Sequence, residues 1–295
     1  MFVLFNRISN AGVRMNSFDI LIKRLILKHK ASPRTQQLFG KFLPMLKGAS
    51  KSLELSSESV REIRHECLRP IFLGLKRCDV VSLLSDVGFD GKMAMRLMFA
   101  DDKATCFGVG VCDDHALPEE SRIKIYNFYD QAGKQIDGKQ HVKVLARRLG
   151  LNVTLIANDF DVLQDISCSA VDIYDAGGSG LKVYSRHFLT RDLEERGGQL
   201  FSPLVMRAYR RLLKAGQLPP VFSICIRYNQ KKRSVRTDFL CNTTTILPYL
   251  EAFDADGTAQ RLCADLFRLR LTVLLTYIGI DLDQRPRTQF YFAVY

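Results

Sequence analysis

The sequence predicts an α/β fold: a doubly wound, mostly parallel sheet with a C-terminal antiparallel hairpin and an N-terminal helical region. The first observation is the stretch from Val80 to Asp114, where an apolar run, a glycine turn, a helix-prone segment and a second apolar run follow one another. The second is the stretch from His141 to Asp159, where a helical pattern leads into the apolar run NVTLIA. Buried parallel strands read as short continuous apolar runs, and a helical crossover between two of them forms a βαβ unit.

The composition is that of a globular protein with a basic N-terminus. The chain has 295 residues, of which 47% are hydrophobic, and this is enough for one large core. Residues 1–51 contain ten Lys or Arg and one acid, so they carry +9 of the net charge of +12. A polyanion such as RNA, DNA or an acidic membrane is a natural partner for such a segment. A solvated helical face explains the same pattern equally well.

The cysteines indicate an intracellular, cytoplasmic protein. Eight cysteines are scattered along the chain without the CxxC or Cys/His spacing of a metal site, so we expect no metal. Reduced thiols that are buried as small hydrophobic groups are the simplest account. No apolar run reaches the roughly 18 residues that a membrane-spanning helix needs. The basic residues 1–30 also resemble a mitochondrial transit peptide in composition, so mitochondrial targeting is an alternative.

The chain before the first expected strand reads as helical. Apolar residues at helical spacing predict helices within residues 1–30, over Gln36–Leu46 and over Ser57–Leu68. We therefore expect two domains, a basic helical N-terminal region over residues 1–75 and an α/β domain over residues 76–295. No internal repeat and no low-complexity segment is visible in the sequence.

The glycine turn after the first apolar run offers a place for a nucleoside. Gly88 allows backbone N–H groups to approach a ligand closely. An acid about 20 residues further on can accept hydrogen bonds from a ribose, and Asp113 stands near that distance. An ordinary turn between a strand and a helix, without any ligand, is an open alternative.

The tripeptide Asp86-Val87-Gly88 resembles the first motif of class I S-adenosylmethionine-dependent methyltransferases, which have a Rossmann-like fold. The sequence departs from this motif at the two positions where the family keeps further glycines, because Asp90 and Lys92 stand there. The run LARRLGLNVTLIANDFDVL also resembles a segment of the same family, in which a helix ends before a strand that delivers an acid to the adenine.

The resemblance implies a set of site residues. Asp86 and Gly88 would shape the turn under the amino-acid end of S-adenosylmethionine, Asp113 would hold the ribose, and Asp159 would contact the adenine. Asp175, which ends the fourth expected strand, would lie where the substrate meets the methyl group. The Asn/Asp-Pro-Pro-aromatic signature of amino-group methylation is absent. In-line positioning of the nucleophile would supply most of the catalysis.

The C-terminal part of the chain predicts the antiparallel hairpin. Val221–Tyr228 and Val235–Cys241 are apolar runs, the first with alternating side chains, and the basic residues Lys231–Arg233 would form the tip between them. A long helix over about Thr258–Ile278 and a last strand over Gln289–Tyr295 would complete the domain.

These expectations lead to a function hypothesis with alternatives. The resemblance implies an S-adenosylmethionine-dependent methyltransferase, and the basic residues 1–51 and Lys231–Arg233 favour a nucleic-acid substrate, RNA more than DNA. The first alternative is a non-catalytic Rossmann-like protein that uses its basic N-terminal helices to bind nucleic acid or a protein partner. The second is a nucleotide-dependent enzyme of another kind on the same sheet.

Overall fold

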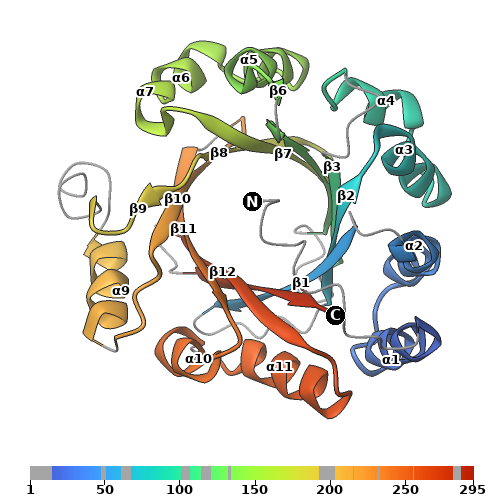
Figure 1. Cartoon of the computed structure of the whole chain (residues 1–295). Helices are drawn as coiled ribbons and strands as arrows, with labels where there is room; N and C mark the ends of the chain where they lie inside the picture. Colours follow the sequence, from blue (N-terminus) through green and yellow to red (C-terminus); the bar gives the residue numbers. More distant parts are fainter. Residues whose placement is uncertain are drawn as a thin grey trace.

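The computed structural model describes residues 15–47, 51–60, 68–100, 107–113, 121–131, 134–192, 203–214, 216–230, 233–254, 256–281 and 287–295. Ten of the described strands form a closed antiparallel barrel (Figure 1). In ring order they are β11 (Arg233–Thr243), β12 (Val273–Asp281), β13 (Arg287–Val294), β1 (Ser52–Val60), β2 (Arg69–Leu75), β3 (Phe107–Cys112), β4 (Arg122–Phe128), β7 (Ile166–Tyr174), β8 (Ser179–Ser185) and β10 (Val221–Tyr228).

The ring closes where β10 pairs with β11. Their register runs from Val221 opposite Leu240 to Tyr228 opposite Arg233. On its other side β10 pairs with β8 and with the short strand β9 (Phe188–Leu189). The short strands β5 (Asp130–Gln131) and β6 (Lys134–Gln135) form a separate hairpin. Closure gives the ring strands partners on both sides and removes the open edges that a flat sheet would expose.

The helices surround the outside of the barrel (Figure 1). They are α1 (Met15–Lys28), α2 (Pro33–Phe42), α3 (Arg77–Asp86), α4 (Gly91–Arg96), α5 (Gly138–Arg148), α6 (Val153–Asn158), α7 (Phe160–Leu163), α9 (Pro203–Lys214), α10 (Leu247–Phe253) and α11 (Thr258–Arg268). A 3₁₀ helix, η2 (Leu43–Lys47), leads from α2 toward β1. Along the chain, helices alternate with pairs of ring strands, so the structure repeats a unit that the sequence does not show.

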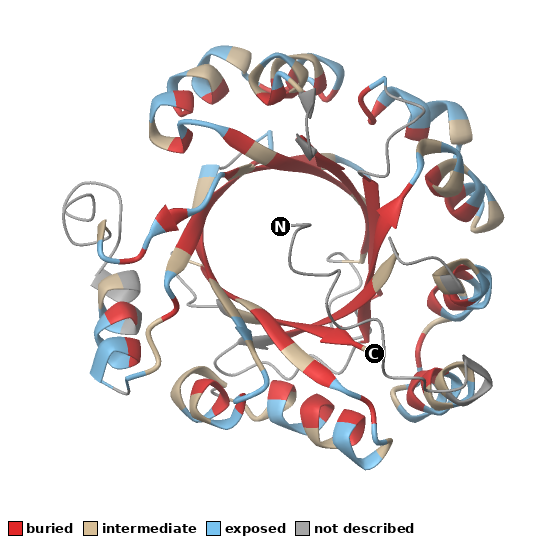
Figure 2. Ribbon diagram, in the orientation of Figure 1, coloured by how far each residue is buried: buried red, intermediate tan, exposed pale blue. Residues whose placement is uncertain are grey.

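The main core lies between the helices and the outer face of the barrel (Figure 2). Phe39 and Phe42 of α2 pack on Phe72 of β2, with ring centroids 5.3 and 4.4 Å apart. Every residue of β4 is buried, although its sequence alternates between apolar and basic side chains. Because neighbouring residues of a strand face opposite sides, one face of β4 packs on helices and the other faces the inside of the barrel.

The predicted doubly wound parallel sheet is wrong, because every pairing in the barrel is antiparallel. The apolar run that begins at Val80 was expected to be a strand, but it lies in α3, where Val80, Leu83 and Leu84 are buried at helical spacing. The backbone N–H of Lys76 donates to the Asp79 carboxylate (3.0 Å) at the start of this helix. A short apolar run fits a buried strand or one face of a helix, and only the packing partner decides.

Other element predictions fail for the same reason. The run NVTLIA lies in α6, which is capped by the Asn152 side chain accepting from the Leu155 N–H (3.0 Å). The helix expected over Ser57–Leu68 is wrong at its start, because residues 57–60 belong to the strand β1. Residues 61–67 lie outside the described residues. The helix expected to reach Ile278 ends at Arg268, and β12 follows it.

The predicted hairpin over 221–241 is present as β10 and β11. The division of the chain into two domains at residue 75 stays a prediction. Its first part supplies the ring strands β1 and β2, which pair with β13 and β3. Among the described residues, no helix is both long enough and apolar enough to cross a membrane.

A candidate active site inside the barrel

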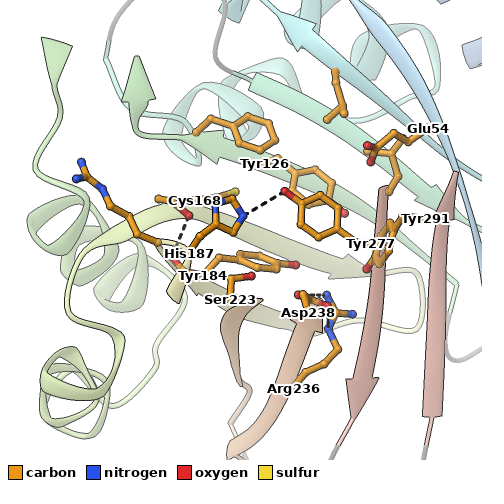
Figure 3. Close-up of a pocket in the computed structure, with 15 residues that line it drawn as sticks. Glu54, Tyr126, Cys168, Tyr184, His187, Ser223, Arg236, Asp238, Tyr277 and Tyr291 are labelled. Carbon is orange, nitrogen blue, oxygen red and sulfur yellow. Dashed lines mark hydrogen bonds and ion pairs between the residues drawn. The ribbon is translucent and has the colours of Figure 1, made fainter. Parts of the chain in front are cut away.

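A cavity of about 340 Å³ lies inside the barrel (Figure 3). Its walls come from β1, β2, β4, β7, β8 and β10 to β13, so nearly every part of the chain contributes to it. The lining residues are Glu54, Ile71, Leu73, Tyr126, Phe128, Ser167, Cys168, Tyr184, Arg186, His187, Ser223, Arg236, Asp238, Tyr277 and Tyr291. The volume lies in the range that holds a small organic ligand.

Aromatic side chains form much of this wall. Tyr126, Tyr184, Tyr277 and Tyr291 come from four different strands and are drawn around the cavity in Figure 3. The rings of Tyr277 and Tyr291 meet edge to face, with their centroids 6.4 Å apart. Aromatic faces carry a negative electrostatic potential that attracts cations. The wall can therefore bind a flat aromatic molecule and also stabilise a positive charge that forms beside it.

Glu54 is a buried acid in the same cavity. Its side chain on β1 is only 7% exposed. Burial raises the pKa of Glu54 to about 7, and a hydrogen bond with the Thr276 side chain opposes part of this rise. A carboxyl group with a pKa near neutrality can gain or lose a proton at physiological pH, which suits general acid–base chemistry.

A cluster of buried basic side chains surrounds Asp172 on β7, which is completely buried. Lys182, Lys124 and Arg122 lie 3.4, 3.6 and 3.7 Å from its carboxylate. Burial alone would raise the pKa of Asp172, but the charges of these three side chains outweigh it and hold this pKa well below its usual range. Among the described residues, these three basic side chains therefore lie around one buried carboxylate.

Burial changes the pKa of both lysines in this cluster. Burial lowers the pKa of Lys124 and lowers that of Lys182 well below its ordinary value, although Asp172 opposes the change. Arg227, which pairs with Lys182 in register, adds to the effect at both lysines. Buried positive charge is stable only when it meets negative charge, so the cluster favours an anionic ligand group.

A small cavity of about 20 Å³ lies next to the larger one, on the side of Arg122 and Lys124. Arg69, Arg122 and Lys124 line it, and Ile71 and Tyr126 border both cavities. The Lys124 Nζ atom lies 5.5 Å from the centre of the Tyr126 ring. A ligand with an anionic end and an apolar end could therefore pass beside Tyr126, with its anion among the cations and its apolar part in the larger cavity.

The structure places the residues predicted for S-adenosylmethionine elsewhere. Asp113 follows β3 and accepts hydrogen bonds from Ser32, Thr35 and Arg34 at the start of α2. Arg34 also pairs with Asp175 (2.8 Å), so Asp113 and Asp175 are brought together. This cluster joins α2 to the ends of β3 and β7.

The other three predicted residues are separate from that cluster. Asp86 ends α3 and pairs with Lys41 (3.4 Å). Gly88 has a φ of +78° and lies in the turn between two helices, α3 and α4, rather than between a strand and a helix. Asp159 lies between α6 and α7, where Arg233 donates two hydrogen bonds to it (2.7 and 2.8 Å) and the Tyr228 hydroxyl donates a third (2.7 Å).

Two strand segments carry a sequence signal for the site. In RIKIYNF (122–128) two basic residues alternate with isoleucines, and in GLKVY (180–184) one lysine stands between apolar residues. Both segments are almost entirely buried. A strand with one apolar face and one basic face usually exposes the basic face to water. Only a closed barrel turns that second face inward.

Three solved structures show the fold by comparison. A 6-dimethylallyl tryptophan synthase is 13% identical, with a TM-score of 0.60, and the match covers 94% of this chain and 95% of that one. A 5-dimethylallyl tryptophan synthase from Streptomyces coelicolor, in complex with DMASPP and Trp, is 15% identical with a TM-score of 0.60 and covers 94% of each chain. NotF in complex with brevianamide F and DMSPP is 14% identical with a TM-score of 0.56, covering 98% of this chain and 97% of that one.

No protein-family model matches the sequence, and a comparison with curated proteins finds no match either. The antiparallel barrel and its structural neighbours overturn the resemblance to a class I methyltransferase and, with it, S-adenosylmethionine as cofactor. They also overturn the nucleic-acid methyltransferase and the Rossmann-like binding protein as functions. At this low identity the likeness establishes one thing: the chain has the barrel fold of the dimethylallyl tryptophan synthases.

Proposed function

We propose that the chain is a prenyltransferase that moves an allylic prenyl group from a diphosphate ester to an aromatic acceptor inside the barrel. The observation that carries this proposal is the buried cation cluster around Asp172 beside a tyrosine-lined cavity that contains Glu54. Two of the similar structures hold DMASPP or DMSPP together with an acceptor, which agrees with a donor and an acceptor sharing one barrel.

The cation cluster would bind the diphosphate of the donor. A diphosphate carries several negative charges on a compact group, and Lys and Arg are the usual partners of phosphate oxygens. The diphosphate would place negative charge beside Lys124 and Lys182 and so favour their ammonium forms, which burial disfavours. The small cavity holds about 20 Å³, so the flexible side chains of Lys124 and Arg122 would move apart to admit the group.

The reaction follows from this placement. The bond between the allylic carbon and the diphosphate oxygen breaks, and both electrons leave with the diphosphate, which the cations stabilise. The resulting allylic cation lies beside Tyr126 and the other tyrosine rings, whose faces stabilise positive charge. The π electrons of the acceptor form the new carbon–carbon bond, or a heteroatom lone pair forms the new bond to that atom. The acceptor then loses one proton.

Glu54 would take that proton. As a carboxylate it would accept a hydrogen bond from an N–H or O–H of the acceptor, which orients the ring and makes it more electron-rich. Its pKa of about 7 allows it to be a base near neutral pH. The tyrosine wall would exclude water, which would otherwise capture the allylic cation.

Contact with nucleic acid is not part of this proposal. Several cations of the N-terminal helices pair with acids of the same chain, such as Lys28 with Asp265 (2.5 Å) and Lys41 with Asp86 (3.4 Å). At the hairpin tip, Arg233 pairs with Asp159 (2.7 Å), and residues 231–232 lie outside the described residues. The intracellular location that the cysteines favour, and the alternative of mitochondrial targeting, stay predictions.

The test is transfer of the dimethylallyl group in vitro. Purified protein is incubated with dimethylallyl diphosphate and a panel of indoles, phenols and naphthols, and products are measured by mass spectrometry together with release of diphosphate. We expect a product that is heavier by one prenyl group, and we expect Lys182→Met to abolish it, because that residue lies against Asp172 in the cation cluster.

Arg147→Gln is the matched control, because Arg147 is exposed on the outer helix α5 and the change also removes one positive charge. The control should keep full activity. The proposal fails if neither diphosphate nor its dimethylallyl ester binds, or if Lys182→Met and Arg147→Gln change binding equally.

A further inference from the structure

A second buried acid, Asp238, lines the same cavity as Glu54. Asp238 lies on β11, is only 4% exposed, and is drawn among the cavity residues in Figure 3. Proton removal from the acceptor requires one base, and Glu54 supplies it. A carboxylate would also repel the diphosphate. The proposed reaction therefore does not explain why a second acid, Asp238, lines the cavity.

Asp238 forms an ion pair with Arg236 on the same face of β11. Arg236 Nη2 donates to Asp238 Oδ2 (2.9 Å), and Nε lies 2.9 Å from Oδ1. Nη1 of Arg236 donates to Gln289 Oε1 on β13 (2.7 Å), and the guanidinium lies 5.7 Å from the centre of the Tyr291 ring. The arginine is thus held against the wall of the barrel by β13 as well as by Asp238.

Gly279 on β12 makes room for this arrangement. It stands opposite Asp238 in the register of β11 and β12. A Cβ atom at position 279 would lie 3.0 Å from Arg236 Nε and would overlap Oδ1 of Asp238. Any side chain there would therefore force the ion pair to move from its present position. Because Gly279 has no side chain, Arg236 can extend past β12 and donate to Gln289 on β13.

The ion pair gives the cavity a hydrogen-bond acceptor with little net charge. An ionised carboxylate has about four lone-pair positions, and Arg236 occupies one oxygen of Asp238 with a hydrogen bond and faces the other. Because Arg236 compensates the charge, the pair would bind a neutral N–H or O–H group. Glu54 faces the same cavity from β1, and the tyrosines of β12 and β13 lie between the two strands in ring order.

We propose that Asp238, positioned by Arg236 and Gly279, is a second hydrogen-bonding anchor for the aromatic acceptor. The acceptors would then be molecules with two N–H or O–H groups, one for Glu54 and one for Asp238. This inference rests on the proposed prenyl transfer for the identity of the ligand. It adds the class of acceptor, namely aromatic molecules with two donors.

The experiment compares acceptors that differ by one donor. The probes are two naphthalenediols with different spacing of their hydroxyls, and the monomethyl ether of each. The chain contains no tryptophan, so the fluorescence of a naphthalene ring can be followed without an indole background. We expect at least one diol to bind about tenfold to a hundredfold more tightly than its ether, the range for a hydrogen bond to a charged group.

Two variants separate anchoring from a structural role. Asp238→Asn alters the anchor, and Gly279→Ala displaces it without changing its chemistry. Both should bring the ratio of diol to ether affinity close to one while the ether still binds as it does to the wild-type protein. A merely structural residue would weaken diol and ether equally, and that result would overturn the proposal.

Two further measurements on the same samples test the proposed prenyl transfer separately: titration with inorganic diphosphate measures donor-site binding, and mass spectrometry detects the prenylated product. If the wild-type protein prenylates diols and ethers and binds them equally, the second anchor is wrong and prenyl transfer stands. If diphosphate does not bind and no acceptor is prenylated, the proposed function fails and the anchor fails with it.

Discussion

Burial inside the barrel shifts the pKa values of Glu54 and Lys182 in opposite directions. Burial penalises the charged form of each group, so the pKa of Glu54 rises to about 7 and the pKa of Lys182 falls. Both shifts oppose the charged state that a structural ion pair would need. They suit groups whose charge changes when a ligand binds or reacts, and this leads to two predictions at the scale of single residues.

The first prediction concerns the base. Only the ionised form of Glu54 can accept a proton, and the ionised fraction increases as the pH rises through about 7. We therefore expect kcat/KM for prenyl transfer to rise with pH across that range. Glu54→Gln should lower kcat/KM by about a hundredfold or more and remove this rise. The measurement is a pH–rate profile of both proteins, and a variant that keeps the wild-type profile would show that another group is the base.

The second prediction concerns Lys182, which faces Asp172, Lys124, Arg227 and Arg236. Burial and the neighbouring cations favour its neutral amine, and a bound diphosphate would favour the ammonium. A bound diphosphate should therefore raise the pKa of Lys182, so that binding takes up protons, and affinity falls, as the pH rises through the pKa of this lysine in the free protein. Calorimetry in buffers with different heats of ionisation counts the protons. Binding without proton uptake, or equal uptake by Lys182→Met, would contradict the prediction.

At the scale of elements, one cluster fixes a helix to the barrel. Ser32, Arg34 and Thr35 at the start of α2 all donate to Asp113 after β3, and Arg34 also reaches Asp175 after β7. The sequence analysis predicted that Asp113 binds the cofactor and that Asp175 faces the substrate. In the structure, both acids join elements that are far apart in the chain. An acid after a strand has the same local sequence signal in either role.

A stability measurement tests this structural role. Asp113→Ala should lower the free energy of unfolding by about 1–3 kcal/mol, because the buried hydroxyl of Thr35 in α2 loses its acceptor. Urea denaturation measures the change, and Asp161→Ala, at an exposed position of α7, is the control. Diphosphate affinity should be the same in both variants. A loss of diphosphate affinity without a loss of stability would instead place Asp113 in the binding site.

At the scale of the whole molecule, the candidate site exists only when the ring is closed. The cations around Asp172 come from β4 and β8, Glu54 comes from β1, and the tyrosines extend to β13. An unfolded chain brings none of these groups together. A ligand of the cluster should therefore bind the folded state alone and stabilise it by mass action.

Thermal unfolding provides the test at this scale. Inorganic diphosphate at about a hundred times its dissociation constant should add about 2.7 kcal/mol to the free energy of unfolding and raise the Tm. Sulfate at equal ionic strength is the control, because it has less charge and a different shape. An equal rise of Tm with both anions would indicate general salt binding by a chain of net charge +12 rather than a diphosphate site.

Local features that depend on neighbouring residues could be predicted from the sequence. The β10–β11 hairpin is one of them, since alternation and a polar turn lie within one short segment. The helical pattern of residues 141–150 is another, and there α5 buries Val142, Leu145 and Ala146.

The tertiary structure alone decided the fold class and the candidate site. The apolar run from Val80 is compatible with a strand and with a helix, and only packing against the barrel selects the helix. The basic residues of 122–128 resemble those of a solvated strand until the ring closes around them. The physical reason is that pairing between strands distant in sequence depends on long-range contacts, and local periodicity carries no information about which strands will meet.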